Sequence, residues 1–126
     1  KPRKRITLAP RVIEASEVGI DGHIGSLFPN SPAFGDSERL VLPVDVPQKP
    51  RKRITLAPRV IEASEVVIVF ASGREKAAVV ERALRGPLDP RALPAQLARN
   101  GVWMLDRGAA MSLERGGSIL RPPAAS

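Results

Sequence analysis

The stretch VVIVFASGREK, residues 66–76, decides the fold class of this chain. Its first six residues, 66–71, are all apolar, and such a run predicts a strand buried on both faces of a parallel sheet. Ser72 follows as the predicted N-cap of a helix, and Glu75 three residues later completes a capping box. The helix is expected over 74–85, where a Gly-Pro pair stops it.

Strands and helices alternate on both sides of this stretch. The β-branched residues of RITLA, 53–57, predict a short strand, and Pro58 suits the first turn of a helix running to about Glu65. VWML, 102–105, predicts a second buried strand. This alternation predicts the α/β class: a truncated, mostly parallel sheet flanked by helices, with segment swapping as an open possibility. The other expected elements are an edge strand over 39–46, interrupted by Pro43, a short helix over 93–99 and a last helical turn or two over 108–113.

An 18-residue string occurs twice in the chain without one difference. Residues 1–18 and residues 49–66 both read KPRKRITLAPRVIEASEV. Diverged repeats would carry substitutions, so the identity indicates a recent duplication or a deliberate recombination, and we favour the latter. We therefore expect one domain over 1–115, in which 1–18 duplicates 49–66, followed by a flexible tail over 116–126.

The two copies also explain the charge of the chain. Each copy holds five basic and two acidic residues, or +3, so the pair supplies +6 of the net charge of +7. The basic character thus comes from one copied segment rather than from a surface shaped for phosphate backbones. We do not expect nucleic-acid binding, although nonspecific binding of anionic polymers stays an alternative.

The composition excludes several classes of site. There is no cysteine, so disulfides and thiolate metal sites are ruled out, and a single histidine makes a metal site improbable. We expect no cofactor, and no membrane association because no apolar run approaches the length of a membrane span. An apolar stretch like that of a signal peptide is not found behind the charged residues at the N-terminus.

The segment GIDGHIGSLFP, residues 19–29, resembles the DGH-x-x-SLFP signature of the glucosamine-6-phosphate isomerase/6-phosphogluconolactonase family. Further pieces follow in the order of that family, so the resemblance covers residues 19–115. These pieces are VPQKP, RITL, SGREK, LPAQL and VWMLDRGAA.

The resemblance implies roles for four residues. It assigns His23 as the general base that activates water against a lactone carbonyl, with Asp21 to orient the imidazole. It assigns Arg53 of RITL and Lys76 of SGREK to the substrate phosphate. It further implies a cytoplasmic enzyme of the pentose phosphate pathway. Without the resemblance, a lone histidine is more often structural or exposed, and both cations are more often solvated surface charges.

Other parts of the family pattern have no match here. The family also carries a phosphate loop of the SGGSTP type, which nothing in this sequence resembles. The strand that should lead into the DGH loop is replaced by the end of the first copy, which we expect to be helical as in its other setting. We therefore predict an engineered or recombined folding domain without catalytic activity. The alternative is an active 6-phosphogluconolactonase that uses His23.

The duplicated segment also predicts self-association. A second RITLAP strand and VIEASE helix could cover the edge of a shortened sheet, within the chain or by exchange with a partner. We expect a homodimer, and a sugar phosphate as ligand only if the chain is active.

Overall fold

A computed structural model describes residues 13–36 and 38–115 of the chain. The predicted flexible tail and the first RITLAP lie outside these residues. The elements are β1 (Ile13–Glu17), the 3₁₀ helix η1 (Pro32–Gly35), β2 (Val41–Asp45), β3 (Lys52–Leu56), α1 (Pro58–Ala63), β4 (Val66–Ala71), the 3₁₀ helix η2 (Arg74–Lys76), α2 (Ala77–Arg85), the 3₁₀ helix η3 (Pro94–Ala98), β5 (Val102–Leu105) and α3 (Met111–Arg115).

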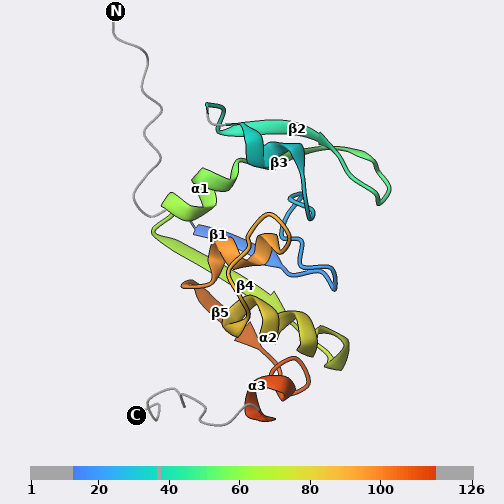
Figure 1. The fold of residues 1–126 in the computed structure, drawn as a ribbon, viewed down its shortest axis with the longest axis vertical. Helices are drawn as coiled ribbons and strands as arrows, with labels where there is room; N and C mark the ends of the chain where they lie inside the picture. The colour runs from blue at the N-terminus through green and yellow to red at the C-terminus, as the bar shows by residue number, and fades with distance from the viewer. Residues whose placement is uncertain (1–12, 37, 116–126) are drawn as a thin grey trace, which may run out of the picture.

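The strands form two separate sheets. A three-stranded parallel sheet has the order β1-β4-β5, and β2 pairs with β3 in a two-stranded antiparallel sheet. Figure 1 shows the β2–β3 pair at one end of the molecule and the parallel sheet near its middle. The predicted α/β class with a mostly parallel sheet is confirmed. No helix among the described residues is long and apolar enough to cross a membrane.

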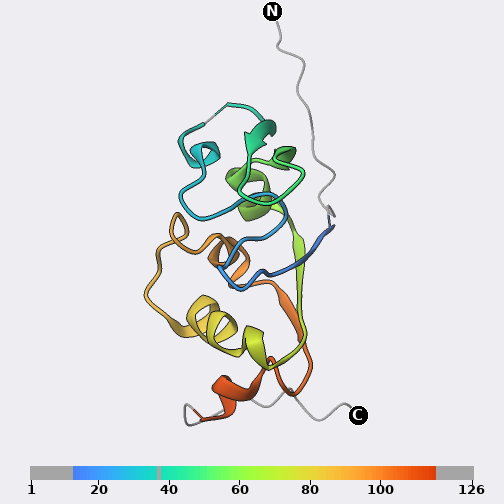
Figure 2. The same cartoon turned by 90° about the vertical axis from the view of Figure 1, so that its right-hand side faces the viewer.

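The central strand β4 supplies one wall of the core. Val67, Val69 and Ala71 alternate along it and are buried, with Val69 fully so. They belong to the same apolar cluster as residues of α2 and η3, namely Val79, Val80, Ala83, Ala95 and Ala98. Figure 2 shows these helices on one side of the parallel sheet. This face of β4 is therefore the core face.

The other face of β4 is not buried, so the prediction of a strand covered on both faces is wrong. Phe70 is 41% exposed, although it follows directly on the fully buried Val69. Val66 and Ile68 on the same face are half-buried. The physical reason is the one-sided arrangement in Figure 2, where no described helix lies against this face.

The predicted capping box at Ser72 is also wrong. The Oγ of Ser72 donates to Asp106 Oδ2 at 2.7 Å and makes no cap contact with the helix. Asp106 Oδ1 accepts the N–H groups of Gly73 at 3.1 Å and Ala109 at 2.9 Å. These bonds join the loops after β4 and β5. The helix α2 begins only at Ala77, after the 3₁₀ turn η2.

The two identical segments adopt different structures. Residues 13–17, IEASE, form β1, which pairs with β4 in parallel with Ile13 opposite Val66. Residues 61–65 have the same sequence, yet Ile61 to Ala63 end α1 and Ser64 is its C-cap. The expectation of a helix at the end of the first copy is therefore wrong.

The neighbours of each copy account for this difference. In the second copy, α1 begins at Pro58, and its residues Val60 and Ile61 are buried in the core. In the first copy, the backbone of residues 13–17 pairs with β4. The N–H of Val18 extends this pairing by one hydrogen bond, to Phe70 O at 3.1 Å. Tertiary contacts thus override a propensity that must be equal in the two copies.

Proline at matched positions of the copies tests these two structures. Ala63→Pro is expected to lower the free energy of unfolding by up to about 3 kcal/mol, because it removes an N–H group from the last turn of α1 and its ring crowds the preceding turn. Ala15→Pro should lower the free energy of unfolding clearly less than Ala63→Pro does. The N–H of Val18 points to β4, and N–H groups alternate along a strand, so the N–H of Ala15 points away from β4. On that side, β1 has no strand partner among the described residues. Urea unfolding of both variants measures the difference, and equal losses would contradict the assignment.

The bonds to Asp106 predict a dependence of stability on acid. The N–H of Ala109, the hydroxyl of Ser72 and the N–H of Gly73 hold the pKa of Asp106 below its ordinary value of 3.8. Because the folded-state pKa is the lower one, this stabilisation is present above pH 3.8 and is lost as the pH falls through the lowered value. Asp106→Asn should flatten the dependence of the melting temperature on pH below about 4, and Ser72→Ala should do so partly. An unchanged acid slope in Asp106→Asn would refute this account.

Candidate active site

The candidate site begins with the loop that leaves β1. The loop turns tightly, since the N–H of Gly22 donates to Gly19 O at 2.9 Å and the N–H of Gly19 donates to His23 O at 2.9 Å. Gly22 has a φ of +93°, and a Cβ there would lie 2.2 Å from Leu93 Cδ1. The carbonyl of Gly22 also accepts the N–H of Ala95 at 2.9 Å. A glycine at position 22 therefore lets the loop turn and dock on η3.

His23 is held by contacts on several sides. Its Nδ1 lies 2.6 Å from Asp21 Oδ1, and its backbone N–H donates to the same oxygen at 3.1 Å. Its ring stacks on Phe28 with centroids 4.0 Å apart. The ring also lies against the backbone of Gly19, where a Cβ would be 2.1 Å from His23 Cε1. The side chain keeps 17% exposure, so the imidazole is positioned and still reachable.

The contact with Asp21 determines which nitrogen can act as a base. An ionised carboxylate only accepts hydrogen bonds, so Nδ1 carries the proton that lies between the two groups. In the neutral form of the ring, Nε2 then keeps its lone pair and can accept a proton. The structure thus brings Asp21 and His23 together as the resemblance implied.

The side chain of Lys76, the last residue of η2, reaches the start of the DGH loop. Its side chain is 12% exposed, and Nζ lies 3.4 Å from Glu17 Oε2 at the end of β1. Nζ also donates to the carbonyl of Val18, the residue that precedes the loop. Lys76 follows β4 as the DGH loop follows β1, so both lie at the carboxyl end of parallel strands, where α/β proteins bind ligands.

Arg53 is not brought to this place. It lies on β3, where its Nε donates to Pro50 O at 2.8 Å and one NH₂ group donates to Lys49 O at 3.2 Å. The guanidinium thus closes the turn between β2 and β3. Among the described residues, no hydrogen bond or ion pair joins Arg53 to His23 or Lys76.

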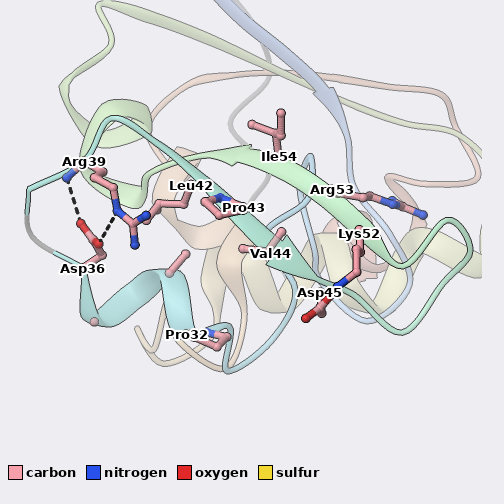
Figure 3. A pocket seen from close by; sticks show the side chains of 12 residues that line it. Pro32, Asp36, Arg39, Leu42, Pro43, Val44, Asp45, Lys52, Arg53 and Ile54 are labelled. Carbon is pink, nitrogen blue, oxygen red and sulfur yellow. Dashed lines mark hydrogen bonds and ion pairs between the residues drawn. The ribbon is translucent and has the colours of Figure 1, made fainter.

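A cavity of about 730 Å³ beside the β2–β3 pair contains Arg53 but neither His23 nor Lys76 (Figure 3). Its other charged groups are paired. Arg39 Nε lies 2.9 Å from Asp36 Oδ2, and Lys52 Nζ lies 3.3 Å from Asp45 Oδ1. Bonds from the backbone N–H groups of Arg39 and Glu38 and from the Arg39 side chain lower the pKa of Asp36 to about 2. The first pair lies in the loop before β2, and the second joins β2 to β3. We do not assign this cavity as the reaction site.

Sequence reasoning missed two residues near the candidate site. Asp106 ties the loops after β4 and β5, and its place directly behind a predicted strand was the available signal. Glu17 lies beside Lys76, but its role depends on the strand structure of the first copy, which the sequence did not indicate. Among the described residues, no cluster of His, Cys, Asp or Glu could hold a metal ion.

Comparison with known proteins places this arrangement in a family. The family described as glucosamine-6-phosphate isomerases/6-phosphogluconolactonase matches residues 15–105. The 6-phosphogluconolactonase of Mycobacterium tuberculosis is 45% identical over 100 residues, which are 76% of this chain and 40% of that protein. The human 6-phosphogluconolactonase is 41% identical over 101 residues, 76% of this chain and 39% of that protein. The chain thus spans about two fifths of the length of these relatives.

Solved structures agree with the sequence comparison. The 6-phosphogluconolactonase of Leishmania guyanensis superposes with a TM-score of 0.66 at 32% identity, over 94% of this chain and 48% of that one. The enzyme of Trypanosoma brucei gives a TM-score of 0.67 at 30% identity, over 80% of this chain and 41% of that one. The chain therefore belongs to the glucosamine-6-phosphate isomerase/6-phosphogluconolactonase family.

Proposed function

We propose that this chain is a recombined, partial 6-phosphogluconolactonase domain, which carries the water-activating part of the site and has little or no turnover by itself. The observation that carries the proposal is the 2.6 Å contact between His23 Nδ1 and Asp21 Oδ1 at the carboxyl end of the parallel sheet. The substrate class, a phosphorylated sugar lactone, is taken from the relatives, which are named 6-phosphogluconolactonases.

The arrangement of His23 suits hydrolysis of a lactone. Asp21 holds the proton on Nδ1, so Nε2 removes a proton from water as the water oxygen attacks the carbonyl carbon. The bond between that carbon and the ring oxygen then breaks, and the imidazolium returns its proton to the leaving oxygen. One water is consumed, and a carboxylic acid and a hydroxyl group are formed.

Lys76 is the cation of this site that supports phosphate binding. Its ammonium group lies at the beginning of the loop that carries His23, and its low exposure strengthens its interaction with an anion. Arg53 stays a separate prediction, because its donors are used by the β2–β3 turn.

Two features support weak or absent turnover. Glu17 places a carboxylate 3.4 Å from Lys76 Nζ, where it opposes the approach of a phosphate. A phosphate monoester carries about −1.5 to −2 charges and accepts several charge-assisted bonds, yet the chain spans only about 40% of the lactonase relatives. The binding interactions that position a substrate for reaction are then reduced.

The duplicated segment offers a matched test of Glu17. Glu17→Gln should raise the affinity of the chain for inorganic phosphate about 1.4-fold to fivefold, because a partly exposed ion pair contributes on the order of 0.2–1 kcal/mol. Glu65→Gln changes the same residue in the same local sequence, but Glu65 is exposed between α1 and β4 and should leave the affinity unchanged. Isothermal calorimetry at low salt measures both, and an equal response of the two variants would remove Glu17 from the site.

Lactone hydrolysis tests the proposed function directly. The rate of acid release from 6-phosphogluconolactone, corrected for spontaneous hydrolysis, should be far below that of the Mycobacterium tuberculosis relative measured alongside. Any excess rate should disappear in His23→Ala and fall in Asp21→Asn, which keeps the size of the side chain but weakens the hold on Nδ1–H. A rate equal to the relative's would overturn the proposal of weak turnover, and an excess rate that survives His23→Ala would overturn the role of His23.

A further inference from the structure

Gln96 is a buried polar residue that the proposed reaction does not use. It lies in LPAQL, residues 93–97, a piece of the family pattern to which the resemblance assigns no role, and it is 5% exposed. Its side-chain oxygen accepts the N–H of Asp89 at 2.6 Å. Its amide nitrogen donates to Pro87 O at 2.9 Å and to Arg82 O at 3.2 Å. The amide group of Gln96 is therefore committed to the end of α2 and to the loop that follows it.

This loop connects Gln96 to the start of η3. The carbonyl of Asp89 accepts the N–H groups of Leu93 at 2.9 Å and of Ala92 at 3.1 Å. Gln96 thus holds the N–H of Asp89, and the carbonyl of Asp89 holds the residues that lead into η3. We call residues 89–95 the clamp loop. Its position depends on the side chain of Gln96, because that side chain bonds both the first residue of the loop and the end of α2.

The clamp loop binds the DGH segment on both sides of His23. Before His23, the carbonyl of Gly22 accepts the N–H of Ala95 at 2.9 Å. After it, the N–H of Asn30 donates to the carbonyl of Arg91 at 2.7 Å. In Figure 2 the orange turn of η3 lies beside the blue chain of the DGH segment. Two backbone bonds therefore fix the ends of the segment that carries the imidazole.

We infer that Gln96 is a positioning residue of the candidate site, which keeps the ring of His23 stacked on Phe28 by holding the clamp loop in place. Both rings lie between the bonds at Gly22 and Asn30 in the sequence, so their separation of 4.0 Å depends on where these bonds hold the backbone. The consequence for catalysis rests on the proposed function. A base displaced by about 1 Å loses on the order of 10²-fold in rate.

Arg99 is a matched control, because it makes bonds of the same kind at the same end of α2. Its Nε donates to Ala83 O at 2.8 Å, and one NH₂ group donates to Gly86 O at 2.6 Å. These bonds end on residues that precede the clamp loop. Loss of either side chain should lower the stability of the chain, since buried carbonyls lose their donors. Only the loss of Gln96 should release the clamp loop.

The single histidine of the chain provides the readout. Its ring-proton NMR signals belong to one residue, and the Phe28 ring displaces them from their positions in the unfolded chain. Gln96→Met keeps the length of the side chain without its hydrogen bonds, and it should remove most of this displacement in the full chain. The N–H groups of Ala95 and Asn30 should exchange with solvent at least about fivefold faster relative to those of β4. Arg99→Met should leave the histidine signals in place and should speed exchange at these two groups no more than in β4.

Unchanged histidine signals in a folded Gln96→Met chain would overturn the inference, as would an equal displacement in Arg99→Met. If Gln96→Met does not fold, hydrogen exchange in the unsubstituted chain decides. The N–H groups of Asp89, Ala95 and Asn30 should then open with one common free energy, and an Asp89 that opens alone would refute the link. Lactone turnover is measured separately. A displaced ring with unchanged turnover supports the role of Gln96 and counts against the proposed role of His23.

Discussion

The parallel pairing of β4 with β1 and β5 is the constraint on which the rest of the structure depends. β4 lies between the other two strands, and all three run in the same direction. Their carboxyl ends therefore meet, and with them the loops that follow: the DGH loop after β1, η2 after β4 and the turn of Asp106 after β5. Asp106 fastens two of these loops through its bonds to Ser72 and Gly73. His23 and Lys76 are 53 positions apart in the sequence, and this parallel pairing is what brings them to the same end of the sheet.

The two identical segments show how strongly the ladder acts. The sequence IEASE has one intrinsic propensity, yet it is a strand where it lies beside β4 and ends a helix where Pro58 and the core contacts of Ile61 precede it. A consequence for the site is that the first copy restores a strand in front of the DGH loop. It also brings Glu17 to Lys76, a contact that the second copy cannot make because its Glu65 lies in a loop. The backbone of the first copy thus supplies the strand that precedes the DGH loop, whereas its Glu17 side chain opposes phosphate binding at Lys76.

The predicted site was found in part, for reasons that can be read from particular residues. Asp21 and His23 are two positions apart, so a short turn brings them together whatever the rest of the fold does. Lys76 could be placed because it follows directly on the apolar run of β4, and parallel strands align such positions. Arg53 could not, because the sequence does not say that RITL pairs with β2 in a separate antiparallel sheet and directs its guanidinium to the carbonyls of residues 48–50.

The sequence by itself determined the α/β class, the positions of most elements and the DGH loop, because periodicity, proline and glycine act over a few residues. The tertiary structure alone decided that 13–17 is a strand, that Ser72 bonds Asp106 instead of capping a helix, and that one face of β4 stays open. The reason is physical. Each of these outcomes depends on which partner lies across a sheet or beyond a loop, and such partners are distant in sequence. The local pattern of an apolar strand is the same whether its second face is covered or left bare.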